Sequence, residues 1–174
     1  MIVTMAGLPG TGKSTLARAL AGRLNAVVLN KDTLRAAMFP PEEIEYSHQQ
    51  DDFVVSVMFD VAGYYFRKDP ARVVFLDGRT FSKKAQIDTL VATCAERGWK
   101  LKVIECVCPD DVARARLERD VLSGLHPAAD RDFSLYLRLK AQADPITIPH
   151  LTIDTGEPLE DCVQRSLSYL LETP

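Results

Sequence analysis

Residues 2–20 read IVTMAGLPGTGKSTLARAL, and this stretch decides the fold. It opens with a short apolar run, residues 2–5, that is typical of a buried strand. Leu16 and Leu20 follow four residues apart, as on one face of a helix. Between these two parts, residues 7–14 match the pattern G-x-x-x-x-G-K-[S/T] at every fixed position. The order of strand, loop and helix predicts a loop whose backbone N–H groups, together with the helix N-terminus, hold phosphate groups.

Each residue type in this loop suits a polyphosphate. Glycines let successive N–H groups turn toward one phosphate, Lys13 can reach the β- and γ-phosphate oxygens, and the Ser14 hydroxyl can bind Mg²⁺. We therefore predict a nucleoside triphosphate and Mg²⁺ as cofactors. The alternative, a chance glycine-rich turn, is disfavoured because the complete motif lies between a strand and a helix. The predicted nucleotide-binding residues are Gly7, Leu8, Pro9, Gly10, Thr11, Gly12, Lys13, Ser14 and Thr15.

The rest of the chain repeats the alternation of strand and helix. Short apolar runs at 26–29, 72–76, 101–107 and 150–153 are predicted strands, and the longest predicted helix covers 42–67. Further helices are predicted to begin near Thr33, Asp110 and Leu159 and to cover 83–97 and 133–143. This alternation predicts a three-layer α/β domain in which helices cover both faces of a parallel sheet.

Composition narrows the class of protein. A length of 174 residues suits one domain over 1–174, and a net charge of −3 argues against strong nonspecific attraction to nucleic acid or an anionic membrane. No apolar run approaches the ~20 residues of a transmembrane helix, and the start lacks the basic residues of a signal peptide. We therefore expect a cytoplasmic protein with no membrane partner. The four cysteines are expected to be buried, reduced thiols and not a zinc or redox site.

Two acidic residues follow predicted strands. Asp77 comes directly after the strand at 72–76, where it can hold Mg²⁺ together with Ser14, or else cap a turn. Asp32 follows the strand at 26–29, and Arg35 lies one helical turn further on, facing the same direction. This pair can take the proton of an attacking hydroxyl and hold an anionic acceptor. The alternative is that Asp32 caps the helix and Arg35 is solvated.

Arginines provide further candidates. Arg116 and Arg119 lie three residues apart in the predicted helix after the fourth strand, within a predicted lid segment around 114–132. In a lid they would stabilise the charge of a transferred phosphoryl group. The alternative is surface pairing four residues apart, Arg114 with Glu118 and Arg116 with Asp120. Arg79, close after Asp77, is a candidate for acceptor binding, or else part of a solvated helix start.

The segments GLPGTGKSTLARAL (7–20), NKDTLR (30–35) and VVFLDGRTFSKKAQ (73–86) together resemble the small P-loop kinases, which include polynucleotide 5′-kinase, adenylylsulfate kinase, gluconate kinase and chloramphenicol phosphotransferase. The resemblance covers essentially the whole chain. It implies a five-stranded parallel sheet in the order 2-3-1-4-5 and transfer of the γ-phosphoryl group of ATP to a hydroxyl. It also implies that Asp32 activates this hydroxyl, that Arg35 lies in the acceptor pocket, and that Arg116 or Arg119 is the lid arginine.

The acceptor is expected to be a small molecule. Residues 42–60, here called the acidic segment, hold six acidic residues and neither lysine nor arginine: Glu42, Glu43, Glu45, Asp51, Asp52 and Asp60. Such a segment would repel a phosphodiester backbone, so a nucleic acid is disfavoured and a polynucleotide 5′-hydroxyl kinase is the alternative enzyme. A switch ATPase without an acceptor is the alternative from another class. Guanine specificity is disfavoured because Cys106–Pro109, CVCP, stands where an N-K-x-D motif would follow the fourth strand.

Overall fold

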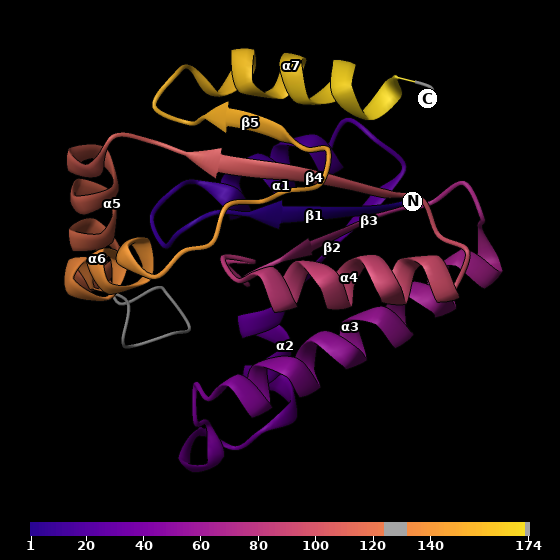
Figure 1. Cartoon of the computed structure of the whole chain (residues 1–174), viewed down its shortest axis with the longest axis horizontal. Coiled ribbons are helices and arrows are strands. Elements are labelled where there is room, and N and C mark those ends of the chain that lie inside the picture. Colours follow the sequence, from indigo (N-terminus) through magenta and orange to yellow (C-terminus); the bar gives the residue numbers. More distant parts are fainter. Residues whose placement is uncertain (124–131, 173–174) are drawn as a thin grey trace.

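The computed structural model describes residues 1–123 and 132–172, and Figure 1 shows them as a central sheet with helices on both faces. The strands are β1 (Ile2–Ala6), β2 (Ala26–Asn30), β3 (Val73–Asp77), β4 (Leu101–Val107) and β5 (Leu151–Asp154). The helices are α1 (Lys13–Ala21), α2 (Lys31–Met38), the 3₁₀ turn η1 (Pro41–Glu43), α3 (His48–Lys68), α4 (Lys84–Glu96), α5 (Asp110–Ser123), α6 (Phe133–Ala141) and α7 (Leu159–Leu171). Neighbouring strands are parallel in the order β2-β3-β1-β4-β5, which confirms the predicted fold class and strand order.

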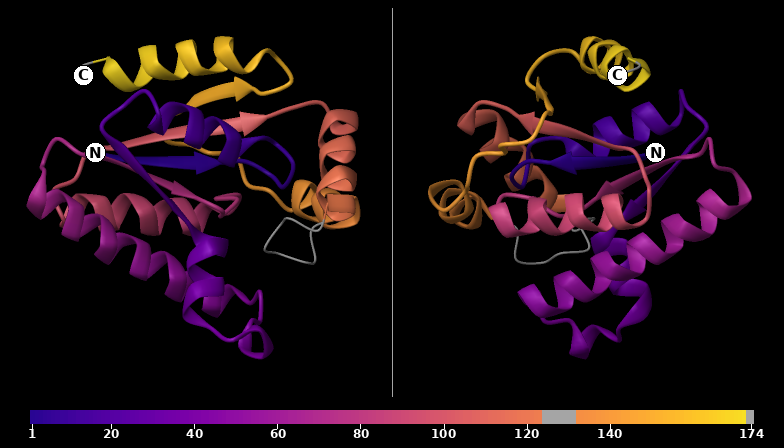
Figure 2. Two further views of the ribbon diagram at one scale, coloured as in Figure 1. Left: turned by 180° about the vertical axis from the view of Figure 1, so that it is seen from behind. Right: turned by 45° about the vertical axis from the view of Figure 1, so that its right-hand side comes forward.

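The central strand β1 shows why these strands are apolar along nearly their whole length. Val3 and Met5 pack with α1 and α7 on one face of the sheet, whereas Ile2 and Ala6 pack with α3 and α4 on the other. Figure 2 shows α7 on one side of the sheet and α3 with α4 on the opposite side. A strand that is covered on both faces has no solvent-facing side, so its sequence lacks the alternation of an amphipathic strand.

Helix α3 begins later than predicted. The expected helix over 42–67 starts instead at His48, because the Ser47 side chain accepts a hydrogen bond from the Gln50 N–H and caps the N-terminus. Tyr46, just before this cap, has a φ of 48°, in the left-handed region that a helix cannot contain. The acidic segment therefore divides at Ser47 into a loop with the turn η1 and the first part of α3.

Helix α2 begins earlier than predicted, at Lys31 instead of near Thr33. Asn30 is its N-cap residue, and the Asn30 side-chain oxygen accepts a hydrogen bond from the Thr33 N–H at 3.0 Å. The alternative in which Asp32 caps this helix is therefore wrong. Asp32 lies in the first turn, where its charge suits the positive end of the helix dipole.

Helices α5 and α6 lie together beyond the carboxyl ends of the strands (Figure 1). Ala113 and Leu117 of α5 pack with Tyr136 of α6 and with Leu8 of the phosphate loop. Asp110, the first residue of α5, accepts hydrogen bonds from Lys140 and from the Tyr136 hydroxyl. The predicted lid thus begins within α5, while its residues 124–131 lie outside the described part of the chain.

The four cysteines form no disulfide in the structure; Cys94, Cys106 and Cys162 are buried as predicted, whereas Cys108 is only partly buried. Burial raises the pKa of Cys106 to about 12 and that of Cys94 to about 11, so these thiols stay protonated at neutral pH. Within the described ranges, no helix combines the length and the apolar character needed to cross a membrane.

Candidate active site

The phosphate loop links β1 to α1 and relies on backbone conformations that favour glycine. Gly7, Gly10 and Gly12 all have positive φ values, and a Cβ atom on Gly7 would lie 2.3 Å from the carbonyl oxygen of Cys106. Gly12 is the N-cap residue of α1 and provides no side-chain cap. No side chain of the N-cap residue therefore competes with a ligand for the N-terminus of α1, where a phosphate would bind.

A cleft of about 780 Å³ opens over this loop. From the predicted nucleotide-binding set, Gly10, Gly12, Lys13, Ser14 and Thr15 line it. Lys13 is only 6% exposed, and its Nζ donates a hydrogen bond to the Leu8 carbonyl oxygen at 2.7 Å. The other members of the set do not line the cleft. Pro9 and Thr11 are buried, and Leu8 packs against α5 and α6. The Gly7 N–H donates a hydrogen bond to the Thr80 carbonyl oxygen.

Asp77 ends β3 and reaches the same cleft. It is 1% exposed, and its Oδ2 accepts a hydrogen bond from the Asn30 side-chain amide at 2.7 Å. Its Oδ1 is buried and has no hydrogen-bond partner among the described residues. A buried carboxylate oxygen without a donor is a fitting ligand for a cation or for cation-bound water. Asn30, which the sequence analysis missed, pairs in register with Asp77 across β2 and β3.

These residues fit Mg²⁺. The ion prefers oxygen ligands and usually takes one or two from the protein, the remainder being phosphate and water oxygens. Ser14 and Asp77 offer such oxygens to one cleft. The described residues contain no group of three or more His, Cys, Asp or Glu side chains that would form a metal cage of protein ligands alone. The donor set therefore suits an ion that arrives with a nucleotide.

The predicted lid arginines differ in their surroundings. The Arg116 guanidinium donates to the Gly10 carbonyl oxygen at 3.3 Å and to both oxygens of Thr155, at 3.0 Å to the hydroxyl and 2.7 Å to the carbonyl. The Thr155 hydroxyl in turn donates to the Thr11 carbonyl oxygen. Arg116 thus joins α5, the phosphate loop and the loop after β5. Arg119 lines the cleft as well.

Arg116 and Arg114, which the surface alternative pairs with acidic residues of the same helix, both contact other elements in the structure. Arg116 points into the molecule, as described above, and the Arg114 guanidinium lies over the Phe133 ring at 4.3 Å from its centre. Thr155 carried no signal in the sequence, since it lies 39 residues from Arg116 in a loop without a motif. Only the fold brings the two together.

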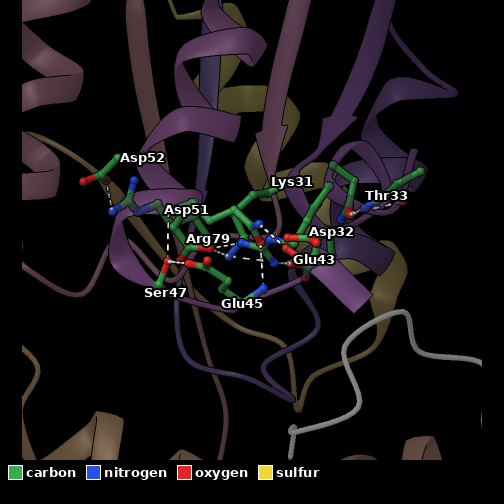
Figure 3. A network of polar contacts seen from close by, with 12 residues as sticks. Lys31, Asp32, Thr33, Glu43, Glu45, Ser47, Asp51, Asp52 and Arg79 are labelled. Carbon is green, nitrogen blue, oxygen red and sulfur yellow. Dashed lines mark hydrogen bonds and ion pairs between the residues drawn. The ribbon is translucent and has the colours of Figure 1, made fainter. Parts of the chain in front are cut away.

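A cluster of charged side chains lies behind the cleft, where α2 meets α3 (Figure 3). We call Lys31, Asp32, Arg35 and Asp51 the α2–α3 charge cluster. Arg35 donates to Asp32 at 3.0 Å and also to Asp51, while Lys31 donates to Asp51 at 2.7 Å and lies 3.6 Å from Asp32. Asp32 and Arg35 therefore form an ion pair, in agreement with the prediction that they face the same direction. Neither of them lines the cleft, to which β2 contributes Val28, Leu29 and Asn30 and α2 contributes Thr33 and Leu34.

Arg79 lies apart from the nucleotide cleft. Its guanidinium donates to Asp52 of α3 at 2.6 Å (Figure 3). It lines a smaller cavity of about 250 Å³ between α3 and α4, together with His48, Phe59 and Phe81. Arg79 is thus neither solvated, as the alternative had it, nor directed at the phosphate loop.

The acidic segment carries less free charge than its sequence suggests. Asp51 pairs with Lys31 and Arg35, Asp52 pairs with Arg79, and Asp60 pairs with Arg97 at 2.9 Å. These cations come from outside the segment, so their contribution is invisible in its composition. The repulsion of a phosphodiester backbone that we expected is weaker as a result.

Comparisons with known proteins agree with this architecture. A family model described as an AAA domain matches residues 2–132, more than half of the chain. The APS kinase CysC of Mycobacterium tuberculosis, in complex with AMPPNP and APS, superposes with a TM-score of 0.71 at 19% identity over 98% of this chain and 97% of that one. The tunicamycin resistance protein of Deinococcus radiodurans gives 0.69 at 20% identity over 99% and 96%.

A gluconokinase from Sinorhizobium meliloti 1021 gives a TM-score of 0.68 at 17% identity over 97% and 90% of the two chains. No curated protein sequence matches the chain. At these identities the solved structures show the fold, which is the kinase-like P-loop fold. With the family model covering residues 2–132, the chain belongs to the AAA-domain family that this model describes.

Proposed function

We propose that this protein is an ATP-dependent kinase that transfers the γ-phosphoryl group to a hydroxyl of a small-molecule acceptor. The observation that carries the proposal is the position of Asp32 relative to Asp77. Asn30, two residues before Asp32, donates to Asp77 directly, so the end of β2 stands beside the Mg²⁺ position. The nucleotide occupies the other side, between the phosphate loop, α5 and the loop after β5. An acceptor then enters from the β2 side.

Residues of this chain have separate tasks in the transfer. The phosphate loop and Lys13 hold the β- and γ-phosphates, while Ser14 and Asp77 hold Mg²⁺, which neutralises phosphate charge when bound. Asp32 takes the proton of the acceptor hydroxyl as its oxygen bonds to the γ-phosphorus. The bond from that phosphorus to the bridging oxygen breaks, and ADP leaves. Arg116 and Arg119 stabilise the charge that spreads over the transferred group.

The surroundings of Asp32 support its role as the base. Arg35 donates to Asp32 Oδ1, and Lys31 approaches the same oxygen, so two cations hold the carboxylate in place. Two structural neighbours are, by name, kinases of small molecules, gluconate and APS, and one of them is a complex with AMPPNP. The free thiols suit a reducing compartment, and we propose that the protein works in the cytoplasm.

One observation favours testing a second candidate function, that of a polynucleotide 5′-hydroxyl kinase. Asp51, Asp52 and Asp60 of the acidic segment are neutralised by partners, so half of the charge that argued against a nucleic acid is compensated. A charged strand nevertheless needs a basic channel, and the acidic segment itself supplies no cation. A small acceptor remains the better fit.

The test is a screen of hydroxyl-bearing compounds for transfer of ³²P from γ-labelled ATP with Mg²⁺. Water is the control acceptor, and an oligonucleotide with a free 5′-hydroxyl represents the second candidate. We expect labelled product with at least one small molecule at a rate above hydrolysis. Hydrolysis without any labelled acceptor would identify a switch ATPase, and labelling of the oligonucleotide alone would identify a polynucleotide kinase.

A further inference from the structure

The cations at the acceptor end of the site are already engaged by carboxylates of the protein. Lys31, Arg35 and Arg79 follow β2 and β3, the two strands that end beside the Mg²⁺ position. Each forms an ion pair with an aspartate at the start of α3, Lys31 and Arg35 with Asp51 and Arg79 with Asp52. Figure 3 shows Asp51 and Asp52 of α3 together with Lys31 of α2 and Arg79 of the loop after β3. With Asp32 included, the three cations face three carboxylates, so the net charge of this group is zero.

Arg35 is the most completely enclosed of these cations. Its side chain is 1% exposed; one terminal nitrogen binds Asp32 and the other binds Asp51. The Tyr46 ring covers the guanidinium at 5.3 Å. Its Nε is buried as well, without a partner among the described residues. An anionic group can therefore reach Arg35 only after Asp51 and the Tyr46 ring have moved.

The loop before α3 is held in its covering position. The Gln50 side chain donates to the Glu43 carbonyl oxygen at 2.8 Å and accepts from the Glu45 N–H at 3.1 Å, so one residue of α3 fixes both sides of this loop. On the opposite side of the cluster, the turn after β3 lies in close contact with the start of α2. A Cβ atom on Gly78 would lie 2.9 Å from the Lys31 nitrogen. The α2–α3 charge cluster is thus enclosed between two fixed segments.

We infer that the acceptor carries no net charge, an inference that rests on the kinase function proposed above. An anionic acceptor would have to compete with Asp51 for Lys31 and Arg35. Removing a partner from a buried ion pair is costly, and we expect it to disfavour the anion on the order of 10²-fold. A neutral polyol or nucleoside meets no such competition, because Asp32 needs only a hydroxyl proton to accept.

The experiment compares acceptors in pairs that differ by one charged group. Glucitol is paired with gluconate, and uridine with uridine 3′-monophosphate, within the wider screen. For the wild type we expect kcat/KM for the neutral member of a phosphorylated pair to exceed that for the anion by about 10²-fold. Preference for the anion would overturn the inference and leave the kinase assignment intact. Transfer to neither member of any compound pair in the screen would overturn both.

Asp51→Asn provides the second arm. It leaves Lys31 and Arg35 with one carboxylate, so we expect the preference for the neutral member to fall by roughly 10-fold, which corresponds to one new charge-assisted hydrogen bond. Asp52→Asn, which changes a largely exposed side chain, makes the same test at Arg79 if Asp51→Asn does not fold. The matched control is Asp60→Asn, which removes a paired carboxylate from the same helix far along α3 and should leave the preference unchanged. An unchanged preference in both Asp51→Asn and Asp52→Asn would contradict the inference.

Discussion

The two ends of the site are built in opposite ways. At the phosphate loop, backbone groups and glycines form the walls, and Asp77 Oδ1 has no partner among the described residues. At the α2–α3 charge cluster, side chains form the walls, and every charge has a partner of opposite sign. The first end lacks ligands that a metal nucleotide brings. At the second end the charges are already balanced by groups of the protein itself.

The largest effect is expected at Lys13 in the phosphate loop. Lys13→Ala removes the cation nearest the phosphates, and we expect kcat/KM for transfer to fall by on the order of 10³-fold or more, with the fold intact. Transfer assays and thermal unfolding measure the two properties. Lys84→Ala, which removes an exposed lysine paired with Asp88, is the control and should leave transfer unchanged. Normal turnover of folded Lys13→Ala would refute the assignment of the phosphate loop.

The next largest effect is expected at Asp32, the proposed base, and it should appear in phosphoryl transfer but not in nucleotide affinity. Asp32→Asn should keep nucleotide affinity within a few-fold, because this carboxylate does not line the nucleotide cleft. Transfer should fall by roughly 10²–10⁴-fold, the usual contribution of a positioned general base. Calorimetry with nucleotide and a transfer assay on the same preparation measure both quantities, with Asp88→Asn as the control. Wild-type transfer by Asp32→Asn would give the residue a structural role only.

A smaller effect distinguishes the two arginines. Arg119→Ala should lose mainly kcat, by roughly 10²-fold, because its contact forms at the transferred group. Arg116→Ala should in addition raise KM for ATP and lower the melting temperature, since Arg116 also ties the phosphate loop to Thr155. Thr155→Val is the matched probe, because it removes the hydroxyl but keeps the Arg116 contacts to the carbonyl oxygens of Thr155 and Gly10, so it should reproduce only part of the structural effect and leave kcat nearly unchanged. Near wild-type kcat in both arginine variants would remove them from the catalytic machinery.

The smallest effect is expected where α5 meets α6. Hydrogen bonds from Lys140 and Tyr136 lower the pKa of Asp110 below its ordinary value of 3.8. A group whose pKa is lower in the folded state stabilises that state above its unfolded pKa and loses this contribution as the pH falls through the folded value. Asp110→Asn should therefore melt slightly lower than the wild type at pH 7, and the difference should vanish in acid. A difference that does not shrink as the pH is lowered into the acid range would contradict this origin.

The sequence allowed good prediction of the parts of the molecule that local patterns determine. Residues 2–20 specify strand, loop and helix within one short segment, and the strand at 101–107 has the same bounds in the structure. Asp77 was predicted to reach the cleft because a residue that ends a parallel strand lies at the ligand edge. The start of α3 was missed because one serine cap and one left-handed tyrosine outweigh a run of helix-compatible residues.

Pairings between distant segments could not be predicted in the same way. Asp51 lies 16 residues from Arg35, and Asp52 lies 27 residues from Arg79, so no spacing rule connects them. Their charges looked like an acidic surface when counted along the chain, although the fold turns them toward cations of neighbouring elements. Arg116 and Thr155 show the same limit on the nucleotide side. A sequence motif is sufficient to predict a site that is formed by the backbone of one segment. A site formed by side chains from several elements can be predicted only once the fold is known.

The central place of β1 also determines when the nucleotide site can exist during synthesis. The ribosome makes β1 before the other strands, yet its two neighbours in the sheet are β3 and β4, made about 70 and 100 residues later. In the phosphate loop, the Gly7 N–H donates a hydrogen bond to the Thr80 carbonyl oxygen, and the Thr11 carbonyl oxygen accepts one from the Thr155 hydroxyl. Thr155, which is needed for the second of these bonds, is therefore translated near the end of the described chain. A ligand that binds only the folded state cannot assist the earlier stages. On the proposed function, ATP would therefore stabilise the finished domain but would not act as a template for the nascent chain.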